Sequence, residues 1–245
     1  MAILSNKIAV VTGASRGIGY HAALSMAEAG AHIIAIAKTV GGLEALDDEI
    51  KAKGGTATLV PMDLQDFDAI DRLGAAIHEK WGKLDILVAN AGILGGLSPL
   101  GHIAPKKFDQ LMNINVTANW RLIRSLDPLL QKSDAGRALF LSSGAPHSCK
   151  AFWGGYAASK AAVEALARVY ANENANTNLN ANIINPGATR TKMRAQAMPG
   201  EDPQSIPHPS ELGKDFVMLS SDSCAENGKI FDCHSQSFKT PQAPI

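Results

Sequence analysis

Short apolar runs alternate along the chain with longer stretches in which apolar residues recur at helical spacing. The runs lack the polar and apolar alternation of a half-exposed strand, which indicates strands buried on both faces. About seven such runs occur, at residues 8–11, 32–37, 57–61, 84–89, 138–141, 182–184 and 229–231. We expect each of them to be a strand.

The stretches between these runs have the spacing of amphipathic helices, as at residues 19–29, 43–53 and 69–81. Strand and helix alternating in this way predict right-handed crossovers and an open parallel sheet. The expected fold class is therefore α/β: one doubly wound domain over residues 1–245, with about seven parallel strands and helices on both faces.

The segment at residues 193–209 breaks this pattern of strands and helices. It has little periodicity and is rich in proline, with Pro199, Pro203, Pro207 and Pro209. A disordered tail is one interpretation, but a helical pattern at residues 211–220 and the run at 229–231 follow it. We therefore expect a substrate lid within the domain, at about residues 189–209.

A glycine-rich turn, Thr12-Gly13-Ala14-Ser15-Arg16-Gly17-Ile18-Gly19, follows the first strand and opens a helix. Gly13 and Gly17 let the backbone turn tightly and approach a pyrophosphate, and Gly19 permits close packing of helix and sheet. The N–H groups at the helix start favour an anion. An ordinary strand-to-helix turn is the alternative, but the position after the first strand favours a Rossmann-type dinucleotide site.

The second strand ends in Ala37-Lys38-Thr39, without the acidic residue that would hold a ribose 2′-hydroxyl. A carboxylate there would repel a 2′-phosphate, whereas Lys38 attracts one, and Arg16 in the glycine turn adds a second cation. Each cation alone is an ordinary surface charge. Together they favour NADP(H) over NAD(H).

Tyr156 and Lys160 open a helical stretch, and their i, i+4 spacing places phenol and ammonium on one face. Such a pair occurs by chance in many proteins. Ser143 stands thirteen residues before Tyr156, at the end of a predicted strand. Singly, these residues are also explained as a core aromatic and a strand-end cap.

In combination, these motifs resemble the classical short-chain dehydrogenases/reductases over essentially the whole chain. The matching pieces are the glycine turn, Asp63, Asn90-Ala91-Gly92, Asn115, Ser143, Tyr156 with Lys160, and Pro186-Gly187-Ala188-Thr189-Arg190-Thr191. Ala89, Ala118 and the segment at residues 228–235 depart from the common family pattern. The last departure leaves the type of oligomer open, because that segment often lies in a subunit interface.

The resemblance implies four catalytic residues. Tyr156 would be the acid that protonates a carbonyl oxygen. Lys160 and the positive nicotinamide ring of the oxidised cofactor would lower the pKa of its phenol from about 10. Ser143 would bind the substrate oxygen. Asn115 would fix a water that links Lys160 to solvent.

The resemblance also implies which residues hold the cofactor. Asp63 would bind the adenine amine, although capping of the next helix is an open alternative. The full expected set is Gly13, Ser15, Arg16, Gly17, Ile18, Gly19, Lys38, Asp63, Leu64, Asn90, Ala91, Gly92, Tyr156, Lys160, Pro186, Gly187, Thr189 and Thr191.

The expected substrate pocket consists of Leu94, Ala145, His147, Trp153 and Met193. It is mostly apolar, and His147 has the alternative interpretation of a surface-loop histidine. We predict an NADP(H)-dependent oxidoreductase that interconverts an apolar ketone or aldehyde, 3-oxoacyl groups included, and its alcohol. The alternatives are an NAD(H)-linked alcohol or sugar dehydrogenase and a dinucleotide sensor without turnover.

Composition limits the partners. Twenty-three basic and twenty-three acidic residues cancel, which argues against broad contact with nucleic acid or an anionic membrane. The three cysteines have no metal-ligand spacing, so no metal is expected, and reduced thiols fit a cytoplasmic protein. No signal peptide or membrane-spanning run is expected. The resemblance implies a homo-oligomer, either a dimer or a tetramer.

Overall fold

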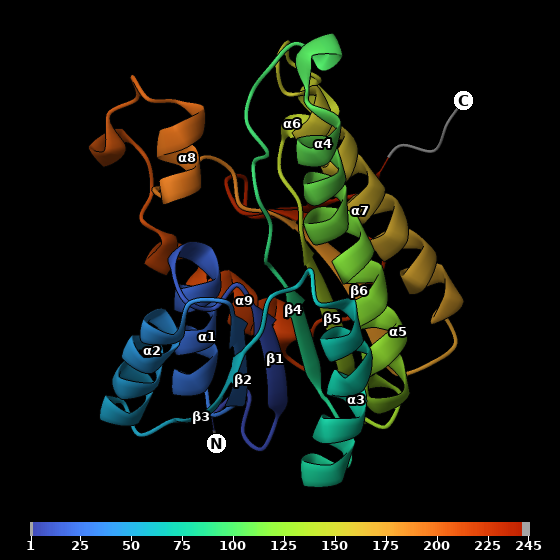
Figure 1. Cartoon of the computed structure of the whole chain (residues 1–245). Coiled ribbons are helices and arrows are strands. Elements are labelled where there is room, and N and C mark those ends of the chain that lie inside the picture. The colour runs from blue at the N-terminus through green and yellow to red at the C-terminus, as the bar shows by residue number, and fades with distance from the viewer. Residues whose placement is uncertain (1, 242–245) are drawn as a thin grey trace.

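The computed structural model describes residues 2–241, so residues 1 and 242–245 of the expected domain lie outside it. One eight-stranded sheet runs through the described chain, in the order β3-β2-β1-β4-β5-β6-β7-β8 (Figure 1). The strands are β1 (Ile8–Thr12), β2 (His32–Ala37), β3 (Thr56–Pro61), β4 (Ile86–Ala89), β5 (Gly136–Leu141), β6 (Leu179–Asn185), β7 (Ile230–Asp232) and β8 (Ser237–Lys239).

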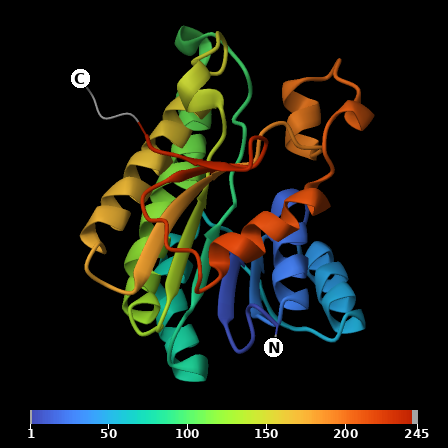
Figure 2. The same ribbon diagram turned by 180° about the vertical axis from the view of Figure 1, so that it is seen from behind.

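Strands β1 to β7 are all parallel, which confirms the predicted doubly wound sheet. The central strand β1 pairs with β2 on one side and with β4 on the other, so the chain changes direction across the sheet at β1. Crevices outside the carboxyl ends of strands at such a point bind ligands. The sequence pattern missed β8, which pairs antiparallel to β7 at the edge of the sheet (Figure 2).

Two layers of helices cover the sheet, as predicted. One layer holds α1 (Gly17–Glu28), α2 (Val40–Ala52) and α9 (Gly213–Ser220), whose apolar residues share one core cluster. The other holds α3 (Phe67–Trp81), α5 (Ala118–Leu130) and α7 (Gly154–Glu173), which share a second core cluster. The layers stand on opposite sides of the strands in Figure 1.

The helix that leads into α5 is irregular. Helix α4 (Pro105–Met112) continues into a π-helical segment, η2 (Asn113–Thr117), and then into α5. A π segment widens the helix by one residue and often marks a functional site. Asn115 lies in this segment and is fully buried.

The chain after β6 leaves the sheet and returns to it. It forms α8 (Lys192–Ala197) and two 3₁₀ turns, η3 (Pro203–Ser205) and η4 (Pro209–Leu212). Figures 1 and 2 both show α8 apart from the sheet, beyond one end of α1. Both ends of this excursion meet α1, because the Thr191 methyl lies 3.5 Å from the position of a Cβ on Gly17, and the His208 and His21 ring centroids are 4.9 Å apart.

The remaining short elements are α6 (Ala145–Ser148) and η1 (Leu100–His102). None of the helices within residues 2–241 combines the length and apolar character that a membrane crossing requires.

Candidate active site

The predicted site residues follow the carboxyl ends of six parallel strands. Because parallel strands end at the same edge of a sheet, the topology gathers them from distant parts of the sequence. In strand order these residues are Gly13 after β1, Lys38 after β2, Asp63 and Leu64 after β3, Asn90 to Gly92 after β4, Ser143 after β5 and Pro186 to Thr191 after β6.

The glycine-rich turn requires glycine by backbone conformation at Gly13 and Gly17 and by lack of space at Gly19. Gly13 and Gly17 have φ of +68° and +60°, in the left-handed region that favours glycine. A Cβ on Gly19 would lie 2.6 Å from the Gly13 carbonyl oxygen and would collide with the Asn90 amide. Helix α1 begins at Gly17, directly after this turn. A narrow backbone turn at a helix N-terminus fits the pyrophosphate of a dinucleotide.

The turn after β4 is fastened to the end of β1. The backbone N–H groups of Asn90 and Ala91 each donate to Thr12 Oγ1 at 3.0 Å, and Asn90 Nδ2 donates to the Thr12 carbonyl at 2.7 Å. Thr12 is fully buried. These bonds hold the two sides of the crevice at a fixed separation.

The end of β2 carries the predicted cationic site. Lys38 Nζ donates to Asp63 Oδ2 at 2.8 Å, and this bond holds the pKa of Asp63 below its ordinary value. The side chain of Asp66 caps α3 by accepting from the Ala69 N–H at 3.0 Å, so the alternative interpretation of Asp63 as that cap is wrong. Arg16 is exposed at the start of α1.

The two predicted proton-handling residues are buried on α7. Tyr156 is 7% exposed and Lys160 is 3% exposed. Lys160 Nζ donates to the Leu141 carbonyl at 2.6 Å and lies 5.8 Å from the centre of the Tyr156 ring. Burial lowers the pKa of Lys160 to about 8. Its pKa is therefore well below that of an exposed lysine.

Within the polypeptide, the pKa of Tyr156 has a contribution that opposes the one expected from Lys160 and the nicotinamide ring. Burial raises it above the ordinary value of a phenol, and the hydrogen bond with Ser143 opposes this rise only in part. Burial disfavours the phenolate because the charged form loses its hydration. Within the polypeptide, Tyr156 is thus held in its neutral form, ready to donate a proton.

Asn115 connects three segments. Its Nδ2 donates to the Ile93 carbonyl and to Ser159 Oγ, both at 3.0 Å, while its Oδ1 accepts from the Ile93 N–H at 2.9 Å. Ser159 Oγ donates in turn to the Tyr156 carbonyl at 2.8 Å. Both amide hydrogens of Asn115 are donated to protein groups. A water can therefore bind this side chain only by donating a hydrogen bond to Oδ1. In this structure the side chain ties the loop after β4 to the Tyr156 turn of α7.

Four of the five expected pocket residues come together beside Tyr156. Leu94, Ala145, Trp153 and Met193 belong to one apolar cluster, which also includes Tyr156, Ala157, Ala197 and Leu97. The Trp153 and Tyr156 rings meet edge to face, with centroids 6.0 Å apart. The surroundings of Tyr156 on this side are therefore apolar.

His147 is the fifth expected pocket residue, and the structure does not bring it into this cluster. Its side chain is 56% exposed, and Nε2 lies 3.2 Å from Glu164 Oε1. Glu164 and its second partner, Ser142, were not singled out from the sequence. The available signal was an acidic residue inside an otherwise apolar helical stretch, four positions after Lys160.

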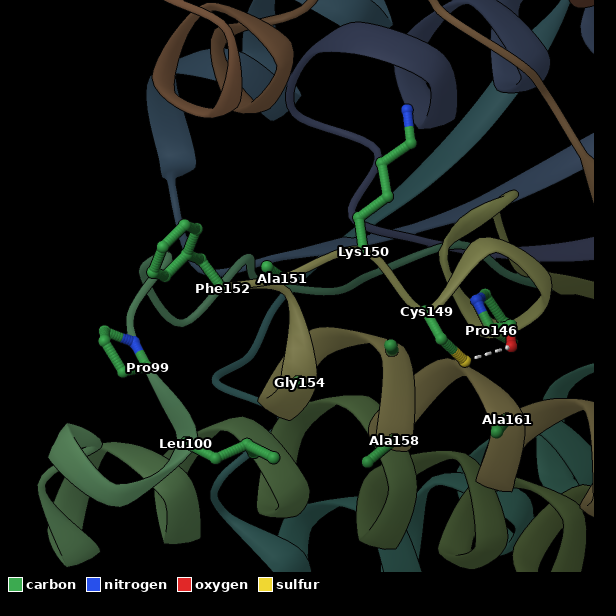
Figure 3. Close-up of a pocket in the computed structure, with 11 residues that line it drawn as sticks. Pro99, Leu100, Pro146, Cys149, Lys150, Ala151, Phe152, Gly154, Ala158 and Ala161 are labelled. Carbon is green, nitrogen blue, oxygen red and sulfur yellow. Dashed lines mark hydrogen bonds between the residues drawn. The ribbon is translucent and has the colours of Figure 1, made fainter.

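A cavity of about 590 Å³ lies on the outer side of α7, and it shares Ala157 with the apolar cluster. Its walls come from the exposed side of α7, the chain that precedes it, and η1 with the residue before it (Figure 3). Neither Ser143, Tyr156 nor Lys160 lines it. In Figure 3 Lys150 extends away from the alanines of α7.

Comparison with known proteins identifies the family to which this geometry belongs. The family model of the short chain dehydrogenases matches residues 7–202, which include every predicted catalytic residue. The chain belongs to the short-chain dehydrogenase/reductase family. Members of this family are oxidoreductases that act on CH–OH groups with NAD or NADP, and so is this protein.

Relatives of this short-chain dehydrogenase/reductase share its full architecture. The oxidoreductase YciK of Escherichia coli K12 is 36% identical over 234 residues, which are 94% of this chain and 92% of YciK. A short chain dehydrogenase from Shigella flexneri 2a, complexed with NADP, has a TM-score of 0.91 and 37% identity, covering 95% of this chain and 99% of its own. A short chain dehydrogenase from Escherichia coli CFT073, complexed with NADPH, has a TM-score of 0.89 and 36% identity. The match covers 95% of this chain and 98% of that chain.

Proposed function

We propose that this enzyme uses NADP(H) to interconvert an apolar ketone or aldehyde, 3-oxoacyl groups included, and the corresponding alcohol. The observation that carries the proposal is the group formed by Ser143, Tyr156 and Lys160. It lies at the same sheet edge as the glycine turn, and an apolar cluster adjoins it. A cofactor bound across this edge would supply or accept the hydride.

The residues of the chain supply proton transfer and orientation. In the reducing direction Tyr156 donates its phenolic proton to the carbonyl oxygen, and Ser143 donates a hydrogen bond to the same oxygen. In the oxidising direction the phenolate removes the hydroxyl proton. The Lys160 ammonium stabilises that phenolate electrostatically. Burial of Tyr156 keeps bulk water away from the transferred proton.

Replacement of Tyr156 by Phe tests the reaction. The variant keeps the ring and loses the proton donor, so we expect NADPH binding to remain and kcat with a panel of carbonyls to fall by about 10²–10⁴. Tyr170→Phe is the matched control, because it removes a hydroxyl from the same helix at a site bonded to Asp127. Its kcat should stay at the wild-type level. Equal kcat for Tyr156→Phe and wild type would refute the role of Tyr156.

The preference for NADP(H) rests on Lys38 and Arg16. Lys38 already binds Asp63, and a 2′-phosphate would bring more negative charge to the same ammonium. Fluorescence titration should show tighter binding of NADPH than of NADH. Lys38→Met should weaken NADPH by about tenfold, the equivalent of a 1.4 kcal/mol loss, and should leave NADH nearly unchanged. Tighter binding of NADH by the wild type would contradict this assignment.

Two further features of the enzyme belong to the proposal. Residues 189–209 would act as the substrate lid, because Met193 and Ala197 reach the apolar cluster and both ends of the segment meet α1.

The chain would form a homo-oligomer, a dimer or tetramer, through the helices α5 and α7. Their exposed faces carry Trp120 and Val169, which are 46% and 54% exposed. Light scattering of the purified protein measures the number of copies.

A further inference from the structure

Glu164 is a buried carboxylate that the reaction described above does not use. It is 8% exposed, on the third turn of α7 after Tyr156. Its Oε1 accepts a hydrogen bond from Ser142 Oγ at 2.5 Å and lies 3.2 Å from His147 Nε2. A buried carboxylate is destabilising unless its charge is compensated and hydrogen bonded, so the groups around Glu164 must provide that compensation.

The end of β5 receives both Lys160 and Glu164. Lys160 donates to the carbonyl of Leu141, and the next residue, Ser142, donates to Glu164. Residues four apart on a helix lie on the same face, so ammonium and carboxylate project from adjacent turns of α7 toward adjacent residues of the strand end. The residue after Ser142 is Ser143, which binds the substrate oxygen in the proposed reaction.

We propose that Glu164 is a positioning residue of this active site, which places a negative charge one turn beyond Lys160 and fixes the strand end that carries Ser143 against α7. This inference rests on the roles proposed above for Tyr156, Lys160 and Ser143. Glu164 acts through these residues and does not touch the substrate.

The electrostatics support this assignment. Burial lowers the pKa of Lys160 to about 8, and the Glu164 carboxylate opposes that effect. Tyr156 shares the helix, His147 approaches from α6, and Arg168 follows one turn beyond Glu164. Among the described residues, no ion pair joins Glu164 to Arg168 or to Lys160, so the carboxylate acts on Lys160 through space and not by direct contact.

The direct test is the titration of Lys160 in the whole protein, followed by NMR of lysines labelled with ¹³C at Cε. The Lys160 signal is the one that Lys160→Arg removes. Glu164→Gln keeps an oxygen that accepts from Ser142 and loses the charge. We expect it to lower the Lys160 midpoint by about one pH unit or more, as loss of a nearby opposite charge does.

Two variants separate charge from structure. Ser142→Ala removes the hydrogen bond and keeps the carboxylate, and Glu164→Asp keeps the charge on a shorter side chain. Both should leave the Lys160 midpoint closer to the wild-type value than Glu164→Gln does. An unchanged midpoint in Glu164→Gln overturns the proposal, and so does an equal shift in Ser142→Ala.

The pH profile of kcat for carbonyl reduction gives the catalytic readout. Reduction needs a protonated Tyr156 beside a protonated Lys160, and loss of the Glu164 charge lowers the pKa of Lys160. The basic limb of the profile in Glu164→Gln should therefore move to lower pH with the Lys160 midpoint. A basic limb that stays at the wild-type pH in Glu164→Gln, although the Lys160 midpoint moves, contradicts the positioning role. If no carbonyl is turned over, the proposed function fails, while the NMR midpoint still tests Glu164 independently.

Discussion

Gly19 offers the sharpest test of how the glycine turn is built. Replacement by Ala adds one Cβ, which would lie 2.6 Å from the Gly13 carbonyl oxygen and would displace the Asn90 amide. Gly13 O is a backbone atom in a turn, so it cannot move away as a flexible side chain would. The Asn90 amide can move, but only by giving up its 2.7 Å bond to the Thr12 carbonyl.

The expected cost follows from these contacts. Overpacking of a tight site costs about 1–3 kcal/mol, and a lost hydrogen bond costs about 1 kcal/mol. Alanine regains about 1 kcal/mol of helix propensity relative to glycine. The net loss of about 1–3 kcal/mol corresponds to a fall in melting temperature of about 2–4 °C for each kcal/mol in a chain of this length. NADPH binding should weaken as well, because the displaced groups shape the pyrophosphate turn.

Gly41→Ala is the control for this experiment. Gly41 lies in the first turn of α2, and a Cβ there would meet nothing within 4 Å. This variant should melt at or above the wild-type temperature, since alanine favours the helix. Thermal unfolding and NADPH fluorescence titration of the three proteins complete the comparison. Wild-type melting and wild-type NADPH affinity in Gly19→Ala would refute the steric argument.

Two further changes have defined outcomes. Thr12→Val removes the oxygen that accepts from the N–H groups of Asn90 and Ala91, so urea unfolding should show a loss of about 2–6 kcal/mol, at about 1–3 kcal/mol for each of the two unsatisfied groups. An unchanged urea midpoint in Thr12→Val would contradict the role of the Thr12 hydroxyl in holding this turn. Burial lowers the pKa of Lys160 to about 8, and the unfolded chain returns it to about 10.4. The unfolded state therefore binds more protons between these values, and this group makes the free energy of unfolding rise with pH from about 8 to 10.4. In Lys160→Met the free energy of unfolding should not show this rise. Parallel curves of unfolding free energy against pH for wild type and variant would disprove the lowered pKa of Lys160.

The sequence predicted the parallel sheet and the edge where the site lies, because both follow from local signals. Buried parallel strands are continuous apolar runs, and the motif residues directly follow those runs. Strand β8 gave no such signal, since Ser237–Lys239 is short, partly polar and half exposed. The π segment around Asn115 was equally invisible, because one extra residue in a helical turn does not alter the apolar spacing enough to be detected.

The properties that depend on tertiary packing were the ones predicted incorrectly or not at all. The resemblance predicted that Lys160 and the oxidised nicotinamide ring lower the pKa of Tyr156, but it carried no information on burial, which raises this pKa within the polypeptide. Both hydrogens of the Asn115 amide bind protein groups that lie far away in the sequence. The orientation of His147 toward Glu164 depends on how α6 lies against α7, which no motif encodes.

The antiparallel strand β8 has a consequence for association between molecules. An open sheet edge presents unpaired N–H and C=O groups, to which a strand from another chain can add. Here the hydrogen-bonding edge of β7 is already occupied by β8, which ends at Lys239, a half-exposed cation paired with Asp232. A second copy therefore cannot extend the sheet from β7, and β8 itself offers only three residues, one of them charged. The hairpin therefore disfavours growth of the sheet into fibres at this edge.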